Sequence, residues 1–193
     1  MFFVIILHMK RVFIVHGWGG SPSGVWIPWL RKTLEARGYQ VTALIMPNTD
    51  APVIKDWIDH LYTVVGTPDK KTYFIGHSIG CQTILRYLET VEEPIGGAVF
   101  VAGWFKLENL EDEDSKEVAR PWTTTPIDLE KIKKMLPKSV LIISDDDPYG
   151  AFEENKQRFS EFISREIVLP NAGHIESSEE PAILAQLLFV ADA

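Results

Sequence analysis

The chain is poor in cysteine, since Cys81 is the single one among its 193 residues. One cysteine cannot form an intramolecular disulfide, so the sequence excludes a disulfide-stapled secreted domain and fits a reducing compartment. Cys81 directly follows Gly80 at the start of a helical pattern, and we expect it to be buried there rather than to take part in redox chemistry. We therefore predict a cytoplasmic protein.

Basic residues are also few. Asp and Glu number 27 against 19 Lys and Arg, which gives a formal net charge of -8 at pH 7. Binding to a nucleic acid needs a basic surface that neutralises phosphates, and the sequence shows no such cluster. We therefore expect no nucleic-acid partner, and the net charge favours solubility instead.

Long apolar runs are missing as well. The opening residues 1–7 are apolar, but a membrane-spanning helix needs ~20 such residues. The same stretch has neither a basic leader nor a small-residue cleavage site, so it does not resemble a secretory signal. We expect no membrane association, and a start at Met9 would make residues 1–8 a dispensable extension.

The usual spacings of metal and nucleotide sites are absent too. No His-Glu-x-x-His or Cys-x-x-Cys pattern occurs, so we expect no metal. The glycine-rich stretch 16–20 follows an apolar run, as phosphate loops do, but it lacks lysine and matches neither the dinucleotide nor the Walker spacing. We therefore expect no cofactor.

The sequence does contain a regular alternation of strand-like apolar runs and helix-like patterns, and its length is most simply that of one domain with a sizeable core. The strand-like runs are 11–16, 41–46, 71–75, 97–102, 140–144 and 166–169, and the helical patterns are 26–37, 53–65, 79–88, 151–163 and 181–190. Such alternation is typical of an α/β fold with a mostly parallel sheet and helices on both faces.

Residues 104–126 interrupt this alternation. A solvated surface excursion accounts for their acidic positions between 108 and 114. The segment nevertheless follows the end of a strand, the edge at which such sheets bind ligands, and it holds Trp104, Phe105 and Trp122. We expect it to form a small cap, with Trp104 and Trp122 as candidate substrate-binding residues.

A Gly-x-Ser-x-Gly pattern with Ser78 at its centre lies between the apolar run 71–75 and the helical pattern 79–88. A serine at a sharp strand-to-helix turn is how a hydrolase exposes a nucleophile, and Gly76 and Gly80 avoid collisions at that corner. Ser78 is therefore the candidate nucleophile. The alternative is that it is an ordinary turn residue.

A serine nucleophile needs a base to remove its proton, and His174 is the candidate. It lies after the last strand-like run and before the last helical pattern. Of the other histidines, His16 belongs to the glycine-rich stretch and His77 adjoins the serine. His8 and His60 are expected at surface or boundary positions.

The base in turn needs an acid to orient it, and residues 145–147 are three consecutive aspartates after the run 140–144. They cannot all be buried in ionised form, so one or two should face water. Pro148 favours an extended conformation at Asp147, which would place Asp145 and Asp147 on one side and Asp146 on the other. With Asp147 as the acid, the order nucleophile, acid, histidine is that of α/β-hydrolases, and Asp146 stays open as the alternative.

Acyl transfer also needs an oxyanion hole, which two backbone N–H groups can form. Ile79, which follows the nucleophile at a helix N-terminus, can supply one of them. The glycines of stretch 16–20 let the backbone approach a substrate closely, so the N–H of Trp18 is the candidate for the other.

Five stretches together resemble the small serine-hydrolase family that includes retinoblastoma-binding protein nine and its bacterial relatives. They are 12–20 (VFIVHGWGG), 76–80 (GHSIG), 120–122 (RPW), 146–148 (DDP) and 173–174 (GH). The resemblance implies a compact α/β-hydrolase with little lid and a triad of Ser78, Asp147 and His174. Relatives often have proline four residues after the acid, where this chain has Ala151, so Asp146 stays open. The Leu-x-Cys-x-Glu motif of a retinoblastoma-binding protein is absent, so we expect no such partner.

We therefore predict a carboxylesterase-like serine hydrolase that cleaves small acyl esters through an acyl-enzyme on Ser78. Amidase or peptidase activity with the same triad is one alternative, and a non-catalytic hydrolase-fold binding protein is the other. The aromatic residues of the expected cleft and the negative net charge favour uncharged esters with short apolar acyl groups.

Overall fold

The computed structural model describes residues 9–192, so the possible extension at residues 1–8 lies outside the described part of the chain. Six strands form one sheet in the order β2-β1-β3-β4-β5-β6, and all five neighbouring pairs are parallel. The strands are β1 (Arg11–Val15), β2 (Gln40–Ala43), β3 (Thr72–His77), β4 (Gly97–Val101), β5 (Ser139–Ser144) and β6 (Arg165–Leu169).

Strands β3, β4 and β5 are buried along their whole length. Their apolar runs do not alternate with polar residues because both faces of the sheet are covered by helices. Because every pair is parallel, the carboxyl ends of all six strands meet at one edge. The loops after β1, β3, β4, β5 and β6, which carry the candidate site residues, therefore leave the sheet on the same side.

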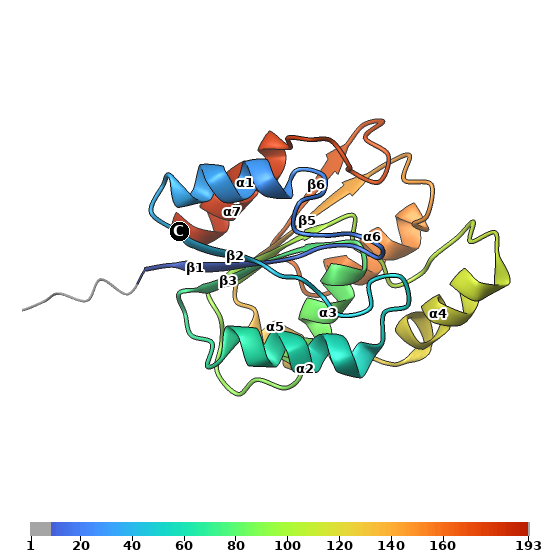
Figure 1. Cartoon of the computed structure of the whole chain (residues 1–193), viewed down its shortest axis with the longest axis horizontal. Helices are drawn as coiled ribbons and strands as arrows, with labels where there is room; N and C mark the ends of the chain where they lie inside the picture. Colours follow the sequence, from blue (N-terminus) through green and yellow to red (C-terminus); the bar gives the residue numbers. More distant parts are fainter. Residues whose placement is uncertain (1–8, 193) are drawn as a thin grey trace, which may run out of the picture.

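Six of the seven helices between residues 9 and 192 cover the two faces of the sheet (Figure 1). On one face, α1 (Ile27–Glu35) and α7 (Pro181–Asp192) pack over a cluster that includes Val12, Ile75 and Leu187. On the other face, the cluster includes Phe13, Phe74 and Phe159. The helices that cover this second face are α2 (Ile54–Val65), α3 (Ile79–Leu88), α5 (Leu129–Met135) and α6 (Phe152–Ser160). No helix between residues 9 and 192 is long and apolar enough to cross a membrane.

Two of the helices, α4 (Glu113–Thr124) and α5, were not predicted from the sequence. Each begins at an aspartate N-cap: the side chain of Asp112 accepts from the Ser115 N–H at 2.7 Å, and that of Asp128 accepts from the Lys131 N–H at 3.0 Å. Acidic residues at a helix N-terminus favour the helix through its dipole. Part of the acidic run therefore starts α4 rather than belonging to an irregular excursion.

Candidate active site

Ser78 occupies the corner between β3 and α3 in a strained conformation, with φ 54° and ψ -121°. The glycines around it are required by close packing. A Cβ at Gly80 would lie 2.3 Å from the Val15 carbonyl oxygen, and one at Gly76 would lie 2.7 Å from the Cys81 nitrogen. A non-glycine residue is held at such a backbone only where the surrounding structure enforces it, which is typical of functional sites.

The His174 ring lies beside the Asp147 carboxylate, with 2.8 Å between Nδ1 and Oδ2. Both side chains are nearly buried, at 10% and 5% exposed. Nδ1–H therefore donates to the carboxylate, which leaves the Nε2 lone pair available as a base. Among the described residues, Ser78 Oγ accepts its hydrogen bond from Trp104 Nε1 rather than pairing with His174. Serine–histidine bonds often tighten only when substrate is bound.

All three aspartates of residues 145–147 hold the loop that carries His174. Asp145 Oδ1 accepts from the Asn171 N–H at 2.9 Å, and Asp146 Oδ1 accepts from the Gly173 N–H at 2.7 Å. The expectation that Asp146 points to the opposite side was wrong, because the chain turns at residues 145 and 146 instead of running extended. Side chains alternate only along a strand. Asp146 also accepts from Ser144 Oγ at 2.6 Å, and this bond, followed by the one from Gly173, lowers its pKa.

His77 holds the backbone of His174, the candidate base. Its Nε2 lies 2.9 Å from the His174 carbonyl oxygen, which can only accept, so Nε2 carries the proton. Burial, and then the neighbouring His174 ring, lowers the pKa of His77 to about 4. His77 is therefore neutral at pH 7, and it fixes the backbone of the residue that it faces.

The glycine-rich loop after β1 brings a free N–H to the site. Among residues 9–192, the hydrogen bonds of this loop use the N–H groups of Gly19 and Gly20, while that of Trp18 has no protein acceptor. His16 holds the loop: its Nδ1–H donates to the Gly17 carbonyl at 2.8 Å, and its Nε2 accepts from the Met46 N–H at 3.3 Å. Burial lowers the pKa of His16, which keeps this neutral tautomer.

Ile79 is the first residue of α3, so its N–H is one of the four that a helix leaves without an acceptor. It therefore starts a helix N-terminus directly after Ser78. The two backbone groups that the sequence suggested for an oxyanion hole thus come from the loop after β1 and from the N-terminus of α3. Cys81, two residues on, is buried as predicted, and burial raises the pKa of its thiol.

A cavity of about 310 Å³ opens over Ser78 and His174. Its other lining residues come from the glycine-rich loop, from the start of α1, from residues 104–115 and from the loops after β5 and β6. They are His16, Gly17, Trp18, Gly20, Ser21, Gly24, Val25, Ile27, His77, Trp104, Leu107, Leu110, Ser115, Tyr149 and Glu176.

Of the two predicted substrate-binding tryptophans, the structure brings only Trp104 to this cavity. Trp122 is 1% exposed and lies in the core, where its Nε1 donates to the Pro52 carbonyl at 2.9 Å and its ring packs edge-on against Trp57. The correction has a simple cause: Trp122 lies on the inner face of α4, so its indole is used to attach this helix to the body of the protein.

Several cavity residues were missed from the sequence, among them Leu107, Leu110, Tyr149 and Glu176. Leu107 and Tyr149 meet because a short antiparallel bridge joins Leu107 to Gly150, and no sequence spacing signals this contact. The position of Glu176, two residues after the candidate base, was the one available signal. Within residues 9–192, no group of three His, Cys, Asp or Glu side chains is placed to hold a metal ion.

Known proteins resemble this chain over most of its length. The chain is 33% identical to YdeN of Bacillus subtilis over 173 residues, which are 88% of each protein. It is 29% identical to the serine hydrolase RBBP9 of Rattus norvegicus over 175 residues, 88% of this chain and 89% of that one. The crystal structure of the B. subtilis ydeN gene product superimposes with a TM-score of 0.86 at 29% identity, over 96% of this chain and all (100%) of the other.

These likenesses confirm the predicted fold class, an α/β-hydrolase fold with helices on both faces of a parallel sheet. The family described as "Serine hydrolase" matches residues 12–183, which is nearly the whole described chain. The resemblance to serine hydrolases noted in the sequence is thereby confirmed, and the chain belongs to the serine hydrolase family.

Proposed function

We propose that the protein hydrolyses small acyl esters through an acyl-enzyme on Ser78, with His174 as the base and Asp147 as the orienting acid. The observation that carries this proposal is the buried contact of 2.8 Å between His174 Nδ1 and Asp147 Oδ2, beside a serine on a strained strand-to-helix corner. If these three residues only packed in the core, they would need neither the strained backbone at Ser78 nor the buried hydrogen bond between His174 and Asp147.

The reaction runs in two halves. In the first, the Ser78 proton passes to His174 Nε2 while Oγ bonds to the carbonyl carbon, and the leaving alcohol then takes that proton. In the second, water gives a proton to His174 Nε2 while its oxygen adds to the acyl carbon, after which the C–Oγ bond breaks and Oγ takes the proton back from His174. Asp147 keeps Nδ1 protonated and stabilises the imidazolium that forms in each half.

The carbonyl oxygen becomes negative in both halves and needs donors. The N–H of Trp18, which lacks a protein acceptor, and that of Ile79, at the N-terminus of α3, can stabilise this oxygen. A loop that follows β1 and a helix that follows β3 would thus converge on one atom of the substrate.

The cavity supports a small, mainly apolar substrate. Its volume of about 310 Å³ is at the lower end of ligand sites, and Val25, Leu107 and Leu110 line it together with Trp18 and Trp104. Residues 104–126 act in this proposal as a small cap, because Leu107, Leu110 and Ser115, on the first turn of α4, line the cavity that contains Ser78. The negative net charge disfavours anionic esters at low salt.

Labelling with a fluorophosphonate tests the activated serine, and hydrolysis of nitrophenyl acetate and butyrate tests the activity. We expect the wild-type protein to be labelled at Ser78, as located by mass spectrometry of the peptides, and Ser78→Ala to remain unlabelled. If the wild type is neither labelled nor active on esters, the alternative of a hydrolase-fold binding protein takes the place of this proposal. Labelling with amidase but no esterase turnover would move the proposal to amides.

A further inference from the structure

Trp104 makes a contact with the nucleophile that a lining residue does not need. Its indole Nε1 lies 3.2 Å from Ser78 Oγ, and both residues are nearly buried, at 2% and 8% exposed. An indole nitrogen can only donate, so Ser78 Oγ is the acceptor in this bond. The serine proton is then left free to face His174.

Trp104 is held in place through its backbone and through the two residues before it. Its backbone carbonyl accepts from Gln82 Nε2 at 2.7 Å, and Ala102, two residues earlier, has a left-handed φ of 47°. The space at Gly103 is tight, because a Cβ there would lie 2.6 Å from the Phe159 ring. The strand-to-loop turn after β4 is therefore fixed by close packing.

The residues after Trp104 are clamped as well. The side chain of Asn155, which is fully buried, accepts from the N–H groups of Phe105 and Lys106 at 2.8 Å each. It also donates to the Lys106 carbonyl at 2.8 Å. A donor fixed in advance in a dry site stabilises charge without a reorganisation cost, so this clamp gives the Trp104 N–H the properties of a catalytic dipole.

We propose that Trp104 is a catalytic hydrogen-bond donor at Ser78 Oγ and that its N–H promotes release of the acyl group. The proposal rests on the acyl-enzyme mechanism above. In the acyl-enzyme, Oγ is an ester oxygen whose lone pair is delocalised into the carbonyl, so it accepts a hydrogen bond poorly. When the C–Oγ bond breaks, the electron pair returns to Oγ and the proton comes from His174, and Oγ becomes a strong acceptor.

The effect on the two halves of the reaction is unequal. In acylation, the free Ser78 hydroxyl already accepts from Trp104, so the bond stabilises the starting state and the transition state alike. In deacylation, the bond is weak in the acyl-enzyme and strong as Oγ departs. Because only interactions that strengthen on the way to the transition state accelerate a step, the Trp104 N–H speeds deacylation more than acylation.

The test removes the N–H alone. Replacing Trp104 by 3-benzothienylalanine keeps the bicyclic ring and exchanges N–H for sulfur, and Trp104→Phe is the genetically simple counterpart. We expect deacylation about tenfold slower, with acylation changed by less than about threefold. Rapid mixing with nitrophenyl acetate separates the burst from the steady state, and intact mass spectrometry should show the acetyl-enzyme accumulating at Ser78.

Trp122→Phe is the matched control, because it removes another buried indole N–H, the donor to the Pro52 carbonyl, at a place outside the cavity. It should leave the ratio of the two rates unchanged. Equal slowing of both steps in the Trp104 variants, unchanged deacylation, or the same shift in Trp122→Phe would each overturn the inference. A wild type that shows neither burst nor labelling would instead overturn the acyl-enzyme mechanism, and this inference with it.

Discussion

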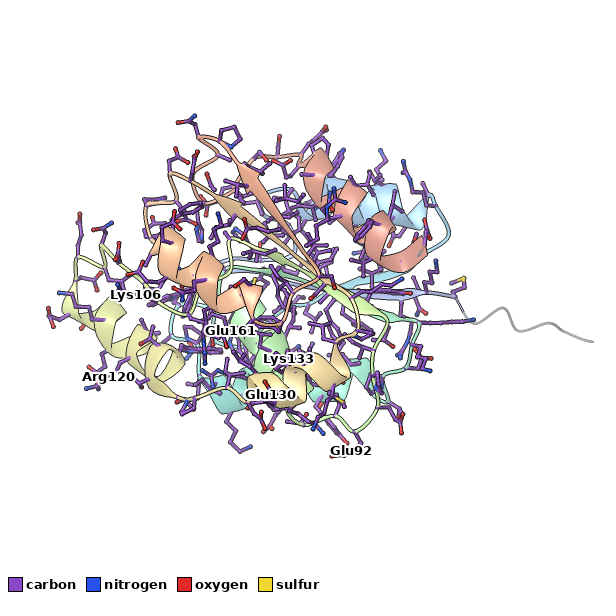
Figure 2. The ribbon with its side chains drawn as sticks, turned by 180° about the vertical axis from the view of Figure 1, so that it is seen from behind. Glu92, Lys106, Arg120, Glu130, Lys133 and Glu161 are labelled. Atoms are coloured by element: carbon purple, nitrogen blue, oxygen red, sulfur yellow. The ribbon has the colours of Figure 1, made fainter. Side chains whose placement is uncertain are left out.

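The residues around Ser78 come from two regions of different character. In the first region, the strand-end loops, the side chains of Ser78, Asp147 and His174 are nearly buried and hydrogen-bonded. The second, the cap segment 104–126, is mostly exposed beyond Lys106, and within α4 only Ala119 and Trp122 are buried. Figure 2 shows Arg120 on the outer side of α4. The difference teaches that the proposed chemistry depends on buried side chains, whereas the exposed part of the segment beyond Lys106 carries none of the proposed catalytic groups.

The C-terminal end of the cap segment is tied to helix α3, which follows Ser78. Arg86, on the nucleophile helix α3, donates through Nη2 to the carbonyl oxygens of Trp122 and Thr125 at 3.0 and 2.9 Å. A cation at these carbonyls also suits the negative end of the α4 dipole. Burial lowers the pKa of Arg86, but a guanidinium remains charged. The two regions therefore differ in packing, and Arg86 joins the end of the segment to α3.

Removing the nucleophile should give the largest effect and leave the fold unchanged. In Ser78→Ala, we expect ester turnover to fall by up to ~10⁶, because serine and histidine act as a unit, and His174→Ala should be comparably inactive. Steady-state kinetics with nitrophenyl acetate measures the loss, and circular dichroism checks the fold. Turnover close to that of the wild type in either variant would contradict the triad.

The next largest effects should distinguish Asp147 from Asp146. We expect Asp147→Asn to cost on the order of 10⁴ in turnover, because an amide cannot hold His174 in the required tautomer or stabilise its charged form. Asp146→Asn should cost about tenfold or less, since its amide oxygen can still accept from the Gly173 N–H. Parallel kcat measurements decide between them, and the reverse order would make Asp146 the acid.

The packing at the corner can be tested by stability. In a helix, Gly→Ala usually stabilises by about 1 kcal/mol, but a Cβ at Gly80 would lie 2.3 Å from the Val15 carbonyl oxygen. We therefore expect Gly80→Ala to lower the free energy of unfolding by about 4 kcal/mol, as judged by urea denaturation. Gly24→Ala is the control, because a Cβ there would meet its nearest atom at an ordinary 3.4 Å. Equal stability of the two variants would mean that the corner can relax.

The buried His77 should make stability depend on pH. Its pKa is lowered from 6.5 to about 4. Between these two pH values His77 is therefore protonated in the unfolded chain but neutral in the folded protein. Stability is then complete above pH 6.5 and falls towards pH 4, by up to about 3 kcal/mol from this group. We expect His77→Gln to lose less of its Tm than the wild type over that window. Parallel Tm profiles for the two proteins would exclude His77 as the source.

The smallest effect is expected in the exposed part of the cap segment, beyond Lys106. We expect Leu110→Ala to shift the preference among nitrophenyl esters of different acyl length by roughly threefold, because a partly exposed leucine contributes little burial. Uncharged short-chain esters should remain the better substrates. The panel should include a carboxylate-bearing ester, and equal activity on that ester or on long chains would contradict the proposed preference. A large loss of ester turnover in Leu110→Ala would contradict the conclusion that the exposed part of the cap segment matters less than the strand-end loops.

Much of the fold follows from local patterns. The apolar runs identified all six strands, and the helical periodicity identified five of the seven helices. The two missed helices, α4 and α5, are short or strongly polar, so their apolar faces are weak signals and their aspartate caps carried the information. The strand order, with β1 between β2 and β3, depends on long-range pairing that no local pattern contains.

The sequence by itself determined the sharp strand-to-helix corner at Ser78, because a Gly-x-Ser-x-Gly pattern between an apolar run and a helical pattern is a local signal. It also placed His174 after the last strand. Only the tertiary structure decided that all three aspartates hold one loop and that Trp104 rather than Trp122 faces the cavity. The reason is physical: these contacts join residues 26 or more positions apart, and their geometry is set by how strands and helices pack rather than by the chain's local preferences.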